Sequence, residues 1–454
     1  MAVRKLLVCL LVGIAAMATA QDAKPWETWQ PPAVTLPTPN AFDTYLKAFA
    51  LKKEIDARVL PPVKEQEPTK GEPPTAGPPP PPPSAAGPPP PPPPADGTPA
   101  GNPAPAPSPA DYFGEGPPDL PLTRRVALYD GVLSLVREAL KQECRIPMPH
   151  DFGILTGSYF GGFRSAERLL ATQAALRRQN GDVAGAVDCA LDGLLLAQHA
   201  MSQRTVMAYL VGIACEAITL RSSLDETIPL LTAPQCREVL AKMLALEQAR
   251  LPLTEAIAGQ ATTRLTFLKT MLMHHDQLEK LLAQYRPYPD SAKYVADLTR
   301  YLGEMNALRW AAIGREYRAW QAAASVPYLR QPKSPPSAGS YIAAYESPPL
   351  HVQLKHAQAL TWLHQRELQL AVRAYLLEQS RFPQDLQGLV PNYLPQVPAD
   401  PFGDGPMKSV MTPDGLAVYG IGADGVDDHG QPTRWSSADP GSKGDMVVVI
   451  SAKP

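Results

Sequence analysis

Residues 165–201 read SAERLLATQAALRRQ, NGD and VAGAVDCALDGLLLAQHAM, and this stretch decides the fold class. Small and apolar side chains recur at three- and four-residue steps on both sides of residues 180–182, which is the repeat of an amphipathic helix. Asn, Gly and Asp at 180–182 are typical of tight turns and helix caps. The sequence therefore predicts two antiparallel helices, over 165–179 and 183–201, joined by a tight turn.

The same pattern continues over residues 121–326, with breaks at prolines and short polar turns. This predicts an α-helical domain. Its hairpin carries small or apolar residues at Ala174, Leu176, Ala184 and Ala186, and in this it resembles a tetratricopeptide-type helical hairpin. The resemblance covers one hairpin, because no second copy recurs at a fixed spacing.

The first residues of the chain, 1–20, have the pattern of a secretory signal peptide. Arg4 and Lys5 form a basic start, residues 6–17 are apolar, and residues 18–20 (Ala-Thr-Ala) form a small-x-small cleavage site. We expect cleavage after this site and export to the periplasm or the exterior. An uncleaved anchor is the alternative, but the apolar run is shorter than the ~20 residues that span a bilayer. No later segment is predicted to span, so we expect no stable membrane insertion.

Proline-rich stretches divide the rest of the chain. The whole sequence has 54 prolines among 454 residues. Proline fixes φ and lacks a backbone donor, so long proline runs favour solvated polyproline II structure over a core. An isolated short helix needs a partner for its apolar face, so the helix before the proline runs is expected to pack beyond them. The predicted segments are an N-terminal extension (21–39), a helix that packs on the helical domain (40–60), a proline-rich disordered insertion (61–120), a linker (327–349) and a C-terminal domain (350–454).

Composition limits the partners of the chain. A formal net charge of −2 provides no electrostatic footprint for nucleic acid. Cysteines in predicted helices, without metal-type spacing, are expected to be small core residues, although disulfides are permitted outside the cytoplasm. These cysteines are Cys144, Cys189, Cys215 and Cys236.

The C-terminal segment combines one long helix with short strands. Apolar residues on roughly one face predict a helix over 352–380, and short runs predict strands at 408–411, 416–421 and 446–451. The segment is therefore expected to form a small α+β domain.

A series of short motifs follows that helix: Tyr375-Leu376-Leu377-Glu378, Arg381-Phe382-Pro383, Tyr393-Leu394-Pro395, Asp400-Pro401-Phe402-Gly403, Tyr419-Gly420-Ile421-Gly422-Ala423-Asp424-Gly425 and Gly444-Asp445-Met446. In order and spacing, the segment resembles the globular head of the major pseudopilin of type II secretion systems. The resemblance implies a helix packed across a small antiparallel sheet, with a calcium-binding acidic loop between the last strands. Pseudopilins begin with a short leader and a hydrophobic anchoring helix that runs straight into the head. Here over three hundred residues, with a predicted signal peptide at their start, precede the head-like segment, so we do not expect a filament subunit.

Four aspartates gather around that loop: Asp424, Asp427, Asp428 and Asp445. Converging hard oxygen ligands suit Ca²⁺, and the resemblance implies the same ion. The alternative is a solvated Asp-Gly hairpin turn, because Asp and Gly are common in such turns. Both interpretations stay open at the level of sequence.

Catalytic motifs of the common hydrolase, metalloprotease and nucleotide-binding types are missing from the sequence. The densest polar cluster, His274-His275-Asp276, lies in a helical stretch and is typical of a solvated face. We therefore expect a non-enzymatic interaction or scaffold protein of the cell envelope, with protein partners. The alternatives are an accessory component of a type II secretion or pilus-like machine, and an enzyme whose site is not visible in the sequence.

Overall fold

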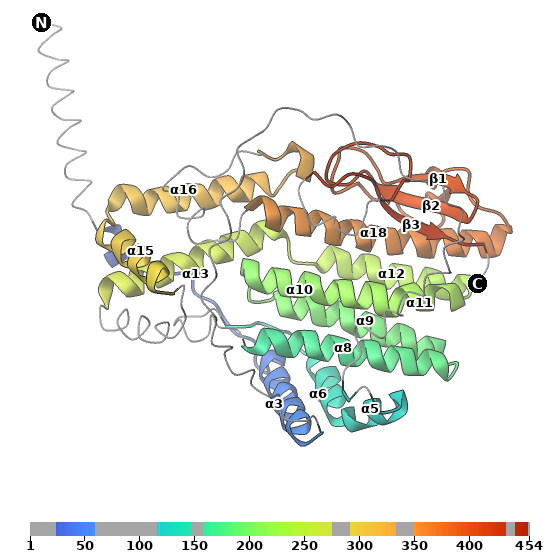
Figure 1. The fold of residues 1–454 in the computed structure, drawn as a ribbon, viewed down its shortest axis with the longest axis horizontal. Helices are drawn as coiled ribbons and strands as arrows, with labels where there is room; N and C mark the ends of the chain where they lie inside the picture. Colours follow the sequence, from blue (N-terminus) through green and yellow to red (C-terminus); the bar gives the residue numbers. More distant parts are fainter. Residues whose placement is uncertain are drawn as a thin grey trace, which may run out of the picture.

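The structure is a computed structural model that describes residues 24–59, 116–117, 119–147, 158–274, 291–332, 349–432 and 441–452. The predicted signal peptide and nearly all of the predicted proline-rich insertion lie outside these ranges. Over the part that is described, helices dominate and one small antiparallel sheet is present (Figure 1). The coarse fold class predicted from the sequence is therefore confirmed.

The helices follow one another along the chain with mostly short connections. In order they are α2 (Pro25–Thr28), α3 (Ala41–Val59), α5 (Leu122–Leu128), α6 (Asp130–Leu140), α8 (Ser158–Gln179), α9 (Val183–Met201), α10 (Val206–Thr219), α11 (Asp225–Thr227), α12 (Ala233–Ala249), α13 (Leu253–Met273), α15 (Ser291–Gly303), α16 (Ala307–Ala323) and α18 (Pro349–Gln379). The strands after them are β1 (Lys408–Thr412), β2 (Gly415–Gly420) and β3 (Met446–Ile450).

The α8–α9 hairpin turns where the sequence predicts it. Asp182 caps α9, because its Oδ1 accepts a hydrogen bond from the Gly185 amide at 2.9 Å. Gly181 has a φ of 77°, a left-handed conformation that glycine adopts without steric cost. α8 begins earlier than predicted, at Ser158. The local chemistry of the turn is therefore sufficient to fix where the two helices meet.

α3 packs against α6 and α8, beside a part of the chain far from it in sequence (Figure 1). Asn40 lies before its first turn and accepts a hydrogen bond from the Phe42 amide at 3.2 Å. The same side chain donates to the Arg145 carbonyl oxygen at 2.8 Å. Tyr45 of α3 contacts Phe163 of α8, with ring centroids 5.0 Å apart. The apolar face of α3 is thus buried on the helical body.

α10 is the start of an apolar helical run in the middle of the molecule (Figure 1). Among the described residues, one helical run, Val206–Leu230, is long and apolar enough to cross a membrane by length and composition. The sequence analysis did not identify it, so the prediction that no later segment is apolar enough is wrong in this respect. In the structure 72% of its most apolar window is buried inside the protein, which accounts for its composition as a core helix.

The three strands form an antiparallel sheet in the order β1-β2-β3. Lys408 pairs with Tyr419 across β1 and β2, and Leu416 pairs with Ile450 across β2 and β3. All residues of β2, the central strand, are buried. The three strands thus lie where the sequence predicts them.

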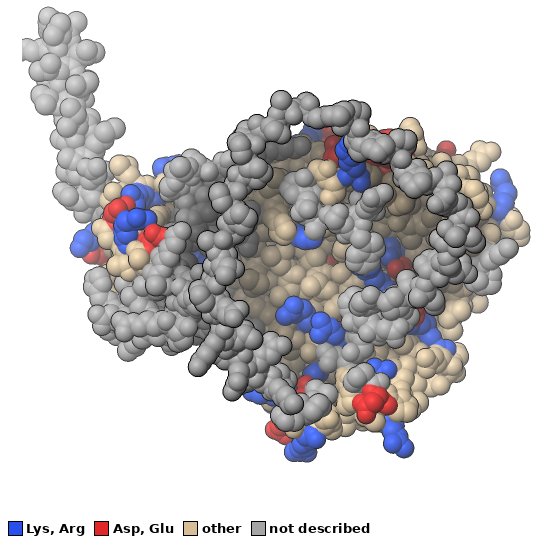
Figure 2. Space-filling model, in the orientation of Figure 1, with Lys and Arg blue, Asp and Glu red and all other residues tan. Residues whose placement is uncertain are grey.

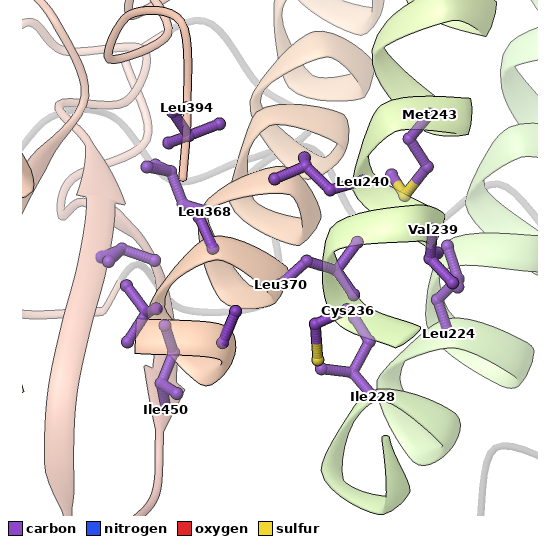
Figure 3. Packing of buried hydrophobic residues seen from close by; sticks show 14 of the residues in the cluster. Leu224, Ile228, Cys236, Val239, Leu240, Met243, Leu368, Leu370, Leu394 and Ile450 are labelled. Atoms are coloured by element: carbon purple, nitrogen blue, oxygen red, sulfur yellow. The ribbon is translucent and has the colours of Figure 1, made fainter. Parts of the chain in front are cut away.

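α18 runs between the sheet and the helical body (Figure 1). It contacts β2 and β3 as well as α10 and α12. Apolar side chains from these elements form one cluster that includes Leu240 of α12, Leu368 and Leu370 of α18, and Ile450 of β3 (Figure 3). Segments on both sides of the predicted linker (327–349) therefore share one hydrophobic core.

The four cysteines in the described residues are free thiols. Cys189, Cys215 and Cys236 are buried, and Cys144 is partly buried. Burial raises the pKa of the Cys189 and Cys236 thiols to about 11. Their environment is that of small core residues rather than of reactive thiolates.

Candidate functional site

The acidic loop follows β2 and returns to the sheet at the start of β3. Asp445 is fully buried there. Its Oδ1 accepts a hydrogen bond from the Asp428 amide at 3.3 Å, and its Oδ2 accepts one from the Gly430 amide at 2.7 Å. Burial raises the pKa of Asp445, and the two amide donors oppose that shift. This carboxylate therefore holds the backbone of the loop in place.

The other predicted calcium ligands also have partners. Asp427 Oδ2 accepts a hydrogen bond from Lys408 Nζ at 2.6 Å, and this interaction lowers the pKa of Asp427. Its Oδ1 accepts from the His429 amide at 3.0 Å. Asp424 Oδ1 accepts from the Val426 amide at 3.1 Å. These short-range bonds are typical of Asx turns in loops.

The loop therefore does not present four unoccupied carboxylates in this conformation. An ion that used both Asp427 and Asp445 would share their oxygens with the amide donors and the Lys408 ammonium. The predicted Asp428 ligand is half-buried in the same loop. Calcium binding at Asp424, Asp427, Asp428 and Asp445 stays a prediction, and the geometry supports the turn role more directly.

A pocket of about 600 Å³ lies elsewhere, between the extended segment that precedes α3 and the helix α13. Its apolar wall comes from residues 31–36, and its polar wall comes from α13 and from the connections before α8 and α10. The polar and small lining residues are Arg145, Arg204, Glu255, Ala258, Gly259, Thr262, Thr263 and Thr266. This volume is within the range of pockets that hold small molecules.

Two guanidinium groups give the pocket a positive side. Arg204 pairs with Glu255 at 3.1 Å. Burial, and then the charge of Arg204, lower the pKa of Arg145. Among the described residues, Glu255 is the single carboxylate that lines the pocket with these two arginines. The pocket therefore suits a ligand that carries an anionic group on an apolar body.

The backbone of the pocket wall is unusually constrained at Arg204. This residue has a φ of 57°, a left-handed conformation that non-glycine residues rarely adopt. A Cβ atom on Gly259 would lie 1.8 Å from the Arg204 carbonyl oxygen, so only glycine fits at that position of α13. The close approach of the two backbones fixes where the Arg204 side chain begins.

The polar cluster singled out in the sequence is only partly within the described residues. His274 is exposed at the end of α13. His275 and Asp276 lie outside the described residues. On the face shown in Figure 2, Lys and Arg side chains are scattered among uncharged residues rather than gathered in one stripe, within the coloured part of the surface.

Sequence reasoning missed a run of buried polar side chains on α18. His364, Gln365, Arg366 and Glu367 are all buried. Arg366 donates a hydrogen bond to Asp225 at 2.6 Å. Burial, and then the neighbouring carboxylate of Glu247, raise the pKa of Glu367. Four consecutive polar residues inside a long predicted helix were the available signal, and the sequence analysis followed only the apolar face.

A second buried network joins α10, the end of α12 and α18. Arg250 donates two hydrogen bonds to Glu216, at 2.7 and 2.9 Å, and a third to the Tyr209 hydroxyl. The Tyr209 hydroxyl lies 2.7 Å from His356 Nδ1. Burial lowers the pKa of His356 to about 3, so its imidazole is neutral in this hydrogen bond. Arg250 and Arg366 thus each have a carboxylate partner of their own.

Comparisons of the chain with protein-family models, with curated proteins and with solved structures found no match.

Proposed function

We propose that this chain is an exported, non-enzymatic binding protein of the cell envelope whose helical body holds a small ligand. The observation that carries this proposal is the pocket of about 600 Å³ with Arg145 and Arg204 on one side and the apolar residues 31–36 on the other. Apolar lining with a few convergent polar groups is the usual composition of a ligand site. The signal-peptide pattern supports the location.

The charge arrangement favours an anionic ligand. A guanidinium binds carboxylates, sulfonates and phosphates through parallel hydrogen bonds. Arg204 already pairs with Glu255, whereas no ion pair or hydrogen bond of the Arg145 side chain occurs with another described residue. Arg145 is therefore the primary anchor for the anionic group in this proposal.

An anilinonaphthalene sulfonate probe tests the pocket, because it combines an anionic group with an aromatic body. Fluorescence titration of the mature chain should show saturable binding. Arg145→Gln should weaken it about tenfold, since a hydrogen bond to a charged group contributes roughly 1.5–3 kcal/mol. Ala258→Phe should abolish it by filling the pocket.

The matched control is Arg58→Gln, which removes the same charge from an exposed side chain on α3. It should leave the affinity unchanged. If the probe binds all of these variants equally, it binds elsewhere and the proposed site is wrong.

A second proposal is an accessory role in a type II secretion or pilus-like machine. The observation in its favour is that α18 lies across a small antiparallel sheet, the arrangement that the pseudopilin resemblance implies. Affinity purification from envelope fractions should then recover components of such a machine. Recovery of the chain alone from a detergent-free periplasmic extract would count against this role.

A further inference from the structure

A cluster of one imidazole and two carboxylates lies between α12 and α18, away from the proposed ligand pocket. Glu247 is in the last turn of α12, and His364 and Glu367 are in the middle of α18. His364 and Glu367 are three residues apart, so they point from the same face of the helix. One ligand atom from each of the three side chains lies within 4.8 Å of the others. Two packed helices therefore bring three potential metal ligands to one point.

His364 uses both ring nitrogens in hydrogen bonds. Nδ1 lies 2.9 Å from the Ala399 carbonyl oxygen, which can only accept, so Nδ1 carries a proton. The other nitrogen, Nε2, lies 2.8 Å from Glu247 Oε1. When the imidazole is neutral, its Nε2 lone pair faces the carboxylates. An ion that replaces the proton between Nε2 and Glu247 would meet a ring already held by an Nδ1–H bond to a backbone carbonyl, which is the usual arrangement of a metal-ligating histidine.

Glu367 is the most unusual member of the cluster. Its side chain is 0% exposed, and neither carboxylate oxygen accepts a hydrogen bond from another described residue. Burying an ionised carboxylate without a donor or a cation is strongly unfavourable. The nearby arginines do not serve it, because Arg250 binds Glu216 and Arg366 binds Asp225. Glu247 thus pairs with His364, whereas Glu367 has no donor among the described side chains.

We infer that Glu247, His364 and Glu367 bind a divalent transition-metal ion. The ligand set favours this class: imidazole nitrogen with carboxylate oxygens suits Zn²⁺, Mn²⁺ or Fe²⁺, whereas Ca²⁺ and Mg²⁺ prefer oxygen alone. An ion here joins α12 of the helical body to α18 of the C-terminal segment.

Two members of the cluster lie near solvent. A pocket of about 350 Å³ lies between α18, the 3₁₀ turn Tyr328–Arg330 and residues 399–404, and His364 is part of its wall. Glu247 is also partly exposed, with 28% of its side chain accessible. Two of the three side chains therefore border solvent, whereas Glu367 is fully buried.

Calorimetric titration of the full mature chain with Zn²⁺, after chelator treatment, tests the inference. The parent should bind one Zn²⁺ per chain. Glu367→Gln and Glu247→Gln should each weaken binding at least tenfold. The matched control is Glu238→Gln, which removes an exposed carboxylate from the same helix and should leave the affinity unchanged. Ca²⁺ should not compete with Zn²⁺.

Folding of the variants is checked independently. Without metal, Glu367→Gln should melt at or above the temperature of the parent, because it removes a buried carboxylate that has no donor. Added Zn²⁺ should raise the melting temperature of the parent only. Should Glu367→Gln fail to fold, the partly exposed Glu247→Gln supplies the comparison. Absence of one-to-one binding in the parent, or equal affinity in both variants and the control, would overturn the inference.

Discussion

Among single residues, Glu167 is a carboxylic acid that is buried in the helical core. Its side chain on α8 is 1% exposed and accepts a hydrogen bond from the Thr219 hydroxyl, while its Oε2 has no donor among the described residues. Burial raises the pKa of Glu167 to about 8 from an ordinary value of 4.5. The folded chain therefore keeps this carboxyl protonated at neutral pH.

The raised pKa of Glu167 predicts a pH dependence of stability. The folded state binds a proton that the unfolded state has lost, so this contribution is complete below pH 4.5 and is lost as the pH rises through about 8. Glu167→Gln should remove this component. Urea unfolding at a series of pH values should then show a smaller fall in the free energy of unfolding for the variant than for the parent.

Glu54→Gln is the control for that comparison, because the Glu54 side chain on α3 is 64% exposed. Its pH profile should follow that of the parent. Profiles of parent and Glu167→Gln that run parallel between about pH 5 and pH 8 would contradict the assignment of the raised pKa to Glu167.

The predicted calcium site can also be tested by substituting individual aspartates. Asp445 is a poor test position, because its substitution would remove two hydrogen bonds that hold the loop. Asp424→Asn with Asp428→Asn removes two carboxylates and leaves Asp445 in place. If the loop binds Ca²⁺ as the resemblance implies, calorimetric titration of the full mature chain should show heat in the parent and not in this variant. Equal traces would exclude a site at these residues.

At the scale of secondary-structure elements, the parts that could be predicted are those whose chemistry is local. The α8–α9 turn depends on Gly181 and Asp182, and both act within a few residues of the chain. The strands carry short apolar runs bounded by turn residues, so their positions were also visible. The small sheet and the dominance of helices followed from these local signals.

The environment of α18 could not be predicted in the same way. Its apolar face indicated one buried side, but the sheet covers one side and α10 with α12 cover another. Polar residues such as His364 and Glu367 are buried by these partners, which are distant in sequence. Whether a polar helix face meets water or a second element depends on tertiary packing, and a single helix does not encode it.

The sheet covers one side of α18, and α10 with α12 cover another, so its leucines differ in burial. Leu370 is 0% exposed and packs in the cluster shared with α12, whereas Leu377 on the same helix is 42% exposed (Figure 3). Leu370→Ala should lower the free energy of unfolding by about 2–5 kcal/mol, because it leaves a cavity. Leu377→Ala, the matched control, should lower it by less than about 1 kcal/mol. Equal losses in chemical denaturation would contradict the packing described for α18.

At the scale of the whole molecule, the helical body and the C-terminal segment depend on one core. Residues of α12, α18 and β3 pack in the same cluster. A fragment of residues 350–454 would expose the α18 surface that α10 and α12 cover. We therefore predict that this fragment alone gives poorly dispersed nuclear magnetic resonance spectra and no cooperative melting transition. A well-dispersed spectrum with a sharp transition would contradict the shared core.

The proposed metal centre lies at this same junction, since Glu247 comes from α12 and the other two ligands come from α18. The most direct measurement is X-ray diffraction from crystals of the mature chain grown with Zn²⁺, recorded on both sides of the zinc absorption edge. The account predicts one strong anomalous peak about 2 Å from His364 Nε2 and from a carboxylate oxygen of each of Glu247 and Glu367. An electron-density map that resolves these three side chains without an anomalous peak between them would contradict it.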